Sequence, residues 1–271
     1  MSAPVSIVRI LTMLTDDKNY TSLISSYKEA LAVLGAELLE IGCFDYQKAP
    51  VQLYGTIMGN GPTKVLITSG IHGEERAGPY GLLEFIKSDI QKYLDRFTFH
   101  IIPVINPIGF EKSERFGSSG MDINRLFDMP QTSPEVKITR NFLHHLQFQL
   151  FIDLHEDSDS DHVYLYESGD GLNDDLILAE DLNFLSLISK RGIGINQEPF
   201  IYGAVSRNGI VYKGYQTPGK SGEQIDGTIA DYLLTSKRVI RAITLETPGK
   251  IEFNSRVRVQ KDFLNFILAP K

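Results

Sequence analysis

The fold of this chain is decided at residues 69–78, where the sequence reads SGIHGEERAG. The apolar run before this segment predicts a buried strand, and the run after it predicts a helix. In open α/β sheets, ligands bind beyond the carboxyl ends of such strands, where glycines permit tight turns. His72 and Glu75 are three residues apart, so a helical turn would bring both side chains to one side. There an imidazole and a carboxylate can share a metal, although an ordinary polar loop would fit the same residues.

The composition is that of a soluble globular protein. The chain has 271 residues, of which 42% are hydrophobic and 23% charged, so we expect one domain spanning 1–271. No apolar run is long enough to cross a bilayer, and the first residues lack the pattern of a secretory signal. A lone cysteine, Cys43, excludes an internal disulfide, and we expect a cytoplasmic location by default. The formal net charge of -7 argues against a nucleic-acid surface, so neither nucleic acid nor membrane is an expected partner.

Apolar periodicity predicts alternating helices and strands. Helical spacing occurs at residues 20–39, 81–93, 134–146, 172–189, 227–234 and 259–268. Apolar runs predict strands at residues 51–58, 65–69, 97–105, 150–154 and 238–245. The strand, helix and strand from 65 to 105 imply a parallel βαβ unit, and the glycine-rich turn at 59–62 predicts a hairpin between 51–58 and 65–69. The predicted fold is a single α/β domain with a mixed, mostly parallel twisted sheet and helices on both faces.

Polar side chains stand at the ends of three predicted strands: His72 with Glu75, His155, and Glu246. Two histidines and a carboxylate, with the fourth position open, form the ligand set of hydrolytic zinc sites. Such a site also needs a carboxylate that takes a proton from water, and Glu246 fits that role. Asp153 lies two residues before His155, so on a strand it projects to the same side and is expected to orient the imidazole. Taken singly, His155 fits a core histidine and Glu246 fits a turn cap, but lone charges at buried strand ends would be costly.

Five segments of the chain resemble, in this order, the motif set of the zinc carboxypeptidase family. They are residues 70–75 (GIHGEE), 106–109 (NPIG), 122–125 (DINR), 153–155 (DLH) and 244–247 (TLET). The superfamily also holds murein-peptide amidases and the succinylglutamate desuccinylase and aspartoacylase group. The resemblance implies a zinc carboxypeptidase-like fold and a zinc site of His72, Glu75 and His155, with Glu246 as general base.

The resemblance also implies roles for residues in the long loop after the second motif. Asn124 and Arg125 would hold a terminal carboxylate of the substrate, and Arg115 would polarise the scissile carbonyl. A guanidinium suits both tasks, because it is permanently charged and binds a carboxylate with two parallel hydrogen bonds. The sequence departs from the digestive-enzyme pattern at Glu74, where that pattern has an arginine. It also departs at the family's mobile tyrosine, which has no clear counterpart near residues 222–227; Tyr215 is the nearest tyrosine.

The sequence therefore predicts a zinc metallohydrolase that cleaves an amide bond next to a free carboxylate in a small peptide or acyl-amino-acid substrate. A carboxypeptidase-like metallopeptidase and an N-acyl amino acid amidohydrolase of the succinylglutamate desuccinylase/aspartoacylase type both remain open. Residues 214–221 (GYQTPGKS) match the phosphate-loop pattern of nucleotide-binding proteins, but too few residues follow for the rest of such a sheet. A non-catalytic binding protein is a further alternative, although it would have no need of Glu246 beside a metal.

Overall fold

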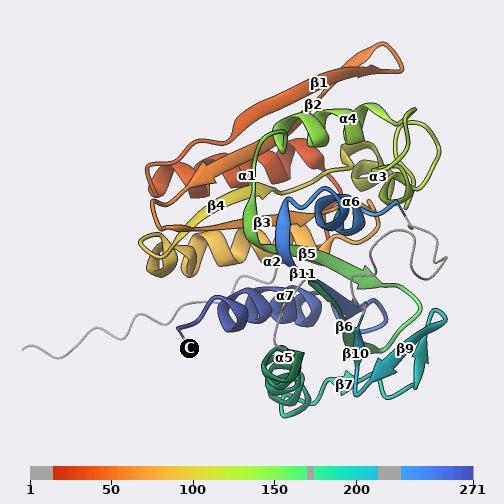
Figure 1. Cartoon of the computed structure of the whole chain (residues 1–271). Coiled ribbons are helices and arrows are strands. Elements are labelled where there is room, and N and C mark those ends of the chain that lie inside the picture. The colour runs from red at the N-terminus through yellow and green to blue at the C-terminus, as the bar shows by residue number, and fades with distance from the viewer. Residues whose placement is uncertain (1–14, 170–173, 213–226, 271) are drawn as a thin grey trace, which may run out of the picture.

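The computed structural model describes residues 15–169, 174–212 and 227–270 (Figure 1). The strands are β1 (Leu39–Tyr46), β2 (Ala49–Met58), β3 (Thr63–Ser69), β4 (Phe97–Ile102), β5 (Phe148–Asp157), β6 (His162–Gly169), β7 (Gly194–Ile195), β8 (Phe200–Ile201), β9 (Ala204–Arg207), β10 (Ile210–Tyr212) and β11 (Val239–Pro248). The helices are α1 (Tyr20–Val33), α2 (Ala77–Ser88), α3 (Pro107–Lys112), α4 (Pro134–Phe142), α5 (Asp174–Ser189), α6 (Ile229–Thr235) and α7 (Phe253–Ile267), with short 3-10 turns η1 (Ile90–Tyr93) and η2 (Ile123–Arg125).

These strands form one mixed sheet in the order β1-β2-β4-β3-β5-β11-β6-β10-β9-β8, with β7 paired to β6. Its centre, β4, β3, β5 and β11, is parallel, and antiparallel pairs flank the centre on both sides. Because the central strands are parallel, their carboxyl ends meet at the same edge of the sheet. The prediction of an α/β fold with a mixed, mostly parallel sheet is confirmed, while a domain spanning all of 1–271 stays a prediction.

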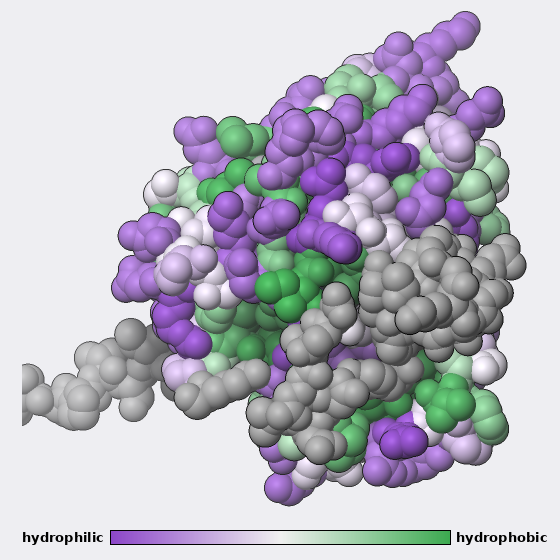
Figure 2. All heavy atoms as spheres, in the orientation of Figure 1, coloured by the Kyte–Doolittle hydropathy of each residue, from purple (hydrophilic) through white to green (hydrophobic). Residues whose placement is uncertain are grey.

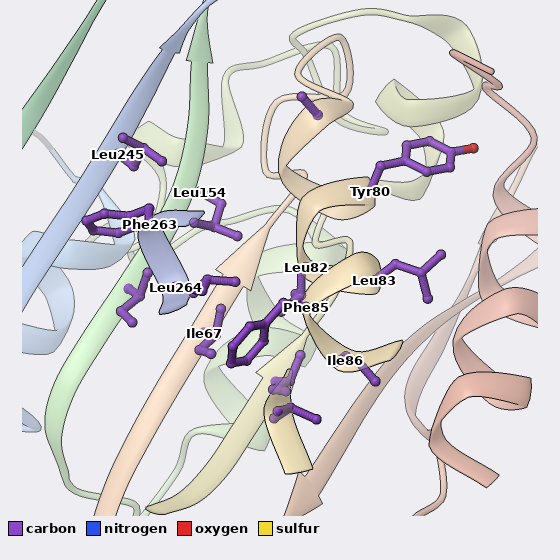
Figure 3. Close-up of a cluster of buried hydrophobic side chains, with 14 of the residues drawn as sticks. Ile67, Tyr80, Leu82, Leu83, Phe85, Ile86, Leu154, Leu245, Phe263 and Leu264 are labelled. Atoms are coloured by element: carbon purple, nitrogen blue, oxygen red, sulfur yellow. The ribbon is translucent and has the colours of Figure 1, made fainter. Parts of the chain in front are cut away.

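Helices cover both faces of the sheet, as predicted. On one face, α1, α2, α5 and α7 bury a large apolar cluster against the strands. Figure 3 shows Phe85 of α2 and Phe263 of α7 in this cluster with Ile67, Leu154 and Leu245 of β3, β5 and β11. On the other face, α4 and α6 bury a second cluster. Each large side chain that is fully buried contributes about 1.5–3 kcal/mol, so this packing fixes the strands and with them their carboxyl ends.

The surface seen in Figure 2 is largely hydrophilic, and apolar residues form smaller patches on it. At the top of Figure 1, β1 and β2 form a long antiparallel hairpin that reaches beyond the central strands. None of the helices in the described part of the chain combines the length and the apolar character needed to cross a bilayer.

Most predicted elements are present, with shifted ends. α1 ends at Val33 rather than at residue 39, because Gly35 with φ of 70° follows the helix. α7 begins at Phe253 rather than at 259, since the Glu252 side chain caps it by accepting from two backbone N–H groups. Apolar periodicity predicts no element at residues 191–222, and their described part forms the short strands β7 to β10. The phosphate-loop match at 214–221, including Tyr215, lies outside the described residues.

The predicted hairpin between residues 51–58 and 65–69 is wrong. β2 pairs with β1 and β4, and β3 pairs with β4 and β5, so β4 lies between the two expected partners. The turn at 59–62 passes close against the start of β4: a Cβ atom on Gly61 would lie 1.9 Å from the backbone carbon of Arg96. Turn residues predict that the chain reverses, but they do not reveal that a later strand is inserted between the two arms.

A buried ionic cluster ties β11 to β6 and α5. Arg241 of β11 pairs with Glu167 of β6 at 2.7 Å, with Glu180 at 2.7 Å and with Asp181 at 3.3 Å. One guanidinium therefore faces three carboxylates. Burial raises the pKa of Asp181 to about 9, and the adjacent Glu167 contributes to the rise. Asp181 is consequently protonated in the folded protein near neutral pH.

This cluster predicts a loss of stability as the pH rises. The folded-state pKa of Asp181 lies above the ordinary aspartate pKa of 3.8, so the folded chain holds a proton that the unfolded chain releases. The free energy of unfolding should fall between about pH 4 and pH 9, by at most about 1.4 kcal/mol per pH unit from this group. Asp181→Asn should flatten that slope, measured by urea denaturation at several pH values. Glu29→Gln, at an exposed position of α1, is the matched control; parallel slopes for wild type and Asp181→Asn would contradict the assignment.

Candidate metal centre

The loop after β3 delivers His72 and Glu75 to the carboxyl edge of the sheet. A glycine is required between them, because a Cβ atom on Gly73 would lie 1.8 Å from the backbone carbon of Gly109 in α3. The N–H of Gly73 also donates to the carbonyl of Glu114 at 3.0 Å. The loop is thereby held against α3, and its two polar side chains turn inward, where both are buried.

The structure brings His72, Glu75 and His155 together in one buried group. Nδ1 of His72 lies 2.6 Å from Oε1 of Glu75, and Nδ1 of His155 lies 2.9 Å from Oε2 of the same carboxylate. Each residue offers one ligand atom, and these atoms all lie within 4.8 Å of one another. Two imidazoles and a carboxylate at this spacing could hold a divalent metal, and they match the donor set of hydrolytic zinc sites.

A second carboxylate lies behind each imidazole. Nε2 of His155 is 2.9 Å from Oδ2 of Asp153, whose other oxygen accepts from Thr68 Oγ1 at 2.6 Å. Nε2 of His72 is 3.1 Å from Oδ1 of Asp122. These carboxylates favour a proton on each Nε2 and leave the lone pair of each Nδ1 free for a metal. The expectation that Asp153 orients His155 therefore agrees with the observed contact.

The charges of the imidazoles and of the carboxylate compensate one another. Burial alone would raise the pKa of Glu75, but His72 and His155 hold that pKa well below its usual range. Conversely, burial opposes the charged form of His155, yet Asp153 and Glu75 raise its pKa well above its usual value. Attraction between the carboxylate and the protonated imidazoles thus holds the donor set together. A bound cation would take the place of the imidazole protons.

Glu246 stands beside this group on the neighbouring strand. In the parallel pairing of β11 with β5, Glu246 is the register partner of His155, so both side chains project to the same face. Burial raises the pKa of Glu246 to about 8, and the negative charge of Glu75 adds to the rise. A cation held by the three candidate ligands would lower that pKa again, because nearby positive charge favours the ionised carboxylate.

Arg115 reaches the same group from the loop after α3. Its Nε and Nη2 lie 2.9 and 2.8 Å from Oδ2 of Asp122, and Nη1 lies 3.8 Å from Oε1 of Glu75. Asn106 caps α3 and donates from Nδ2 to the carbonyl of Arg115 at 3.3 Å. Asp122 therefore links Arg115 to His72. Asp122 is the first residue of the DINR motif, but the sequence alone assigned it no role. Glu74 is half-buried nearby, and burial raises its pKa.

Asn124 and Arg125 lie on the turn η2, immediately after Asp122. The N–H of Asn124 donates to Oδ1 of Asp122 at 2.9 Å, and its side-chain oxygen accepts from the N–H of Ile229 at 3.0 Å. The Nη1 group of Arg125 donates to the carbonyl of Asn124 at 2.8 Å, and the Arg125 side chain is exposed. The turn is close against Gly227, where a Cβ atom would lie 2.5 Å from the carbonyl oxygen of Arg125. Asp122 thus connects these two residues to the candidate ligands.

Helix α7 braces the strand that carries His155. Gln260 is fully buried and donates from Nε2 to the carbonyl of His155 at 2.7 Å. Arg256 donates to Oε2 of Glu156 at 2.5 Å, and Oε1 of Glu156 accepts from the first N–H of α2 at 2.6 Å. The backbone N–H of Glu156 in turn donates to Oε2 of Glu75 at 3.1 Å. Sequence reasoning missed these residues; the available signal was Gln260, a polar residue on the apolar side of its helix.

Part of this chain is similar in sequence to known proteins. Residues 61–190 match the model of the succinylglutamate desuccinylase/aspartoacylase catalytic domain. Among curated proteins, the chain is similar to cytosolic carboxypeptidase 3 of Bos taurus, with 29% identity over 115 residues. It is also similar to cytosolic carboxypeptidase 2 of Homo sapiens, with 30% identity over 115 residues. Each alignment covers 38% of this chain but only 12% and 13% of the respective relative.

Solved structures share the fold over nearly the whole chain. A candidate metallopeptidase from Shewanella amazonensis has a TM-score of 0.76 at 21% identity, covering 94% of this chain and 95% of that one. A metallo-carboxypeptidase from Burkholderia cenocepacia has a TM-score of 0.63 at 20% identity, covering 93% and 68%. The predicted resemblance to the zinc carboxypeptidase-like superfamily is confirmed.

Proposed function

We propose that this protein is a zinc-dependent hydrolase that cleaves an amide bond next to a free carboxylate. The observation that carries the proposal is the convergence of both Nδ1 atoms and the Glu75 carboxylate, with Glu246 in register beside His155. A non-catalytic binding protein would need the ligands but not Glu246, a half-buried carboxylate in register beside His155. The carboxypeptidase-like relatives and the matched catalytic domain add independent support.

The donor set fits zinc, which His72, Glu75 and His155 would hold through two nitrogens and one oxygen. When bound, zinc polarises the scissile carbonyl and lowers the pKa of the attacking water toward neutrality. Glu246 takes the proton from that water and passes it to the leaving amine nitrogen. Arg115, anchored by Asp122, donates hydrogen bonds to the carbonyl oxygen as negative charge develops on it.

The exposed guanidinium of Arg125 binds the free carboxylate of the substrate, together with the Nδ2 group of Asn124. Since the Asn124 oxygen accepts from Ile229, Nδ2 is the side-chain atom that would donate to a ligand. Two substrate classes satisfy this arrangement: a small peptide with a free carboxyl terminus, and an N-acyl amino acid. The carboxypeptidase relatives favour the first, and the match to the succinylglutamate desuccinylase/aspartoacylase domain favours the second. A panel of C-terminal, γ-glutamyl and N-acyl amides, assayed with added zinc, separates the two.

The carboxylate behind His155 should control metal affinity. Asp153→Asn weakens the acceptor for the Nε2 proton, so the imidazole becomes a poorer and less fixed ligand. We expect the zinc dissociation constant to rise about 10- to 100-fold, measured by competition with a chromophoric chelator. Asp159→Asn, on the exposed turn after the same strand, is the control. A folded Asp153→Asn protein with wild-type zinc affinity would refute this role.

Glu246→Gln should separate metal binding from turnover. The amide keeps the shape of the side chain but cannot take a proton, so zinc should bind with unchanged stoichiometry while kcat falls by about 10²–10⁴-fold. Zinc content and hydrolysis of the best substrate of the panel are the two measurements. Glu40→Gln on exposed β1 should leave both values unchanged. Wild-type turnover in Glu246→Gln would exclude Glu246 as the base.

Arg125→Ala should affect substrates according to their free carboxylate. Loss of a charge-assisted contact should lower kcat/KM by about 10–100-fold on carboxylate substrates, mainly through KM. The matching carboxamide substrates should be hydrolysed about as poorly by both proteins. Arg207→Ala, at an exposed position of β9, is the control for loss of an arginine. An equal decrease on acids and amides would show that Arg125 has another role.

A further inference from the structure

A cavity lies at the amino-terminal edge of the central strands, opposite the edge that carries the candidate metal centre. It has a volume of about 400 Å³ and is lined by Lys64, His145, Leu146, Gln147, Ser236 and Arg238. Lys64 lies at the start of β3, residues 145–147 directly precede β5, and Ser236 and Arg238 directly precede β11. These three strands are parallel neighbours, so their amino ends meet here. Along β5, Phe148 and His155 are roughly 23 Å apart, at about 3.3 Å per residue.

The lining of this cavity is cationic. It contains two permanent positive charges, Lys64 and Arg238, together with the imidazole of His145, and none of the six lining residues is acidic. Neither Lys64 nor Arg238 forms an ion pair with any carboxylate in the described part of the chain. The protein has a formal net charge of -7, so a hollow lined by unpaired cations has the opposite sign to the protein as a whole. A concave site of one sign concentrates the field and attracts the opposite charge.

Backbone carbonyls hold the guanidinium of Arg238 in place. Nη1 of Arg238 donates to the carbonyls of Leu143 and Leu146 at 3.3 and 3.5 Å, so the guanidinium is anchored to the end of α4. Its Nε has no hydrogen-bond partner among the described residues, which leaves the group incompletely satisfied. The backbone of His145 has φ of 66°, a conformation that glycine usually supplies after a helix. Here that position carries an imidazole into the lining of the cavity.

We propose that this cavity binds a small oxyanion with two negative charges, of the phosphate type. A fixed guanidinium and an ammonium are the usual partners of phosphate oxygens in proteins, and the Gln147 amide supplies a neutral donor. The volume falls at the lower end of the range for small-molecule sites, so a phosphate group with a small organic substituent fits. The site is separate from the candidate metal centre and requires no hydrolytic activity.

Inorganic phosphate is the probe, titrated into the zinc-loaded protein at constant ionic strength set with chloride. The imidazole resonances of His145 report binding by NMR and are assigned with His145→Gln. We expect a saturable shift of His145, and a dissociation constant that rises about tenfold or more in Lys64→Gln, because one charge-assisted contact is lost. Lys237→Gln removes an equal charge from an adjacent exposed residue outside the lining, and should bind phosphate like the wild type.

Lys64 is preferred to Arg238 for this test, since Arg238 also supports the backbone at the end of α4. Three results would overturn the proposal. They are a phosphate-induced shift confined to His72 and His155, a shift reproduced by chloride alone, and equal affinities in Lys64→Gln and Lys237→Gln. Because the readout is binding at His145, an enzyme that proves inactive in every amide assay would leave the result unaffected.

Discussion

The candidate centre depends on one contact: a buried carboxylate, Glu75, placed between the Nδ1 atoms of two histidines. Both distances are shorter than 3 Å, and the far nitrogen of each ring faces another carboxylate. Rotating either ring would break a contact on both sides at once, so the ring orientations are fixed by two opposed interactions. The positions of Asp122 and Asp153 therefore matter as much as those of the three candidate ligands.

This arrangement is possible because parallel strands end at one edge. β3, β5 and β11 are adjacent, although they lie far apart in the sequence, and each contributes a residue within one or two positions of its end or in the following loop. The apolar packing of α2 and α7 holds the strands in place, and α7 adds polar contacts from Gln260 and Arg256 to the backbone and side chain at residues 155 and 156. Packing and positioning are thus performed by the same helix.

The residues of the centre could be predicted from the sequence because two separate features of the sequence indicate the end of a buried strand. An apolar run shows where a strand is buried, and a polar residue directly after it shows where a charge must find partners, as at His72, His155 and Glu246. Strand order carries no such local signal, which explains why β4 was not expected between β2 and β3. The brace from α7 was equally hidden, because a contact between Gln260 and the carbonyl of His155 depends on a helix that the sequence only shows to be amphipathic.

Charge balance gives a further reason to favour a dication at this site. Among the surrounding carboxylates, Asp122 is matched by Arg115, and Glu156 is matched by Arg256. Glu75, Asp153 and Glu246 are then left with the two histidines, whose rings must be neutral at Nδ1 to act as ligands. Glu75 and Asp153 are buried and Glu246 is half-buried, so three ionised carboxylates beside neutral imidazoles would repel one another. Protons on the histidines and a raised pKa at Glu246 relieve this repulsion, whereas a bound dication would relieve it with Glu246 ionised.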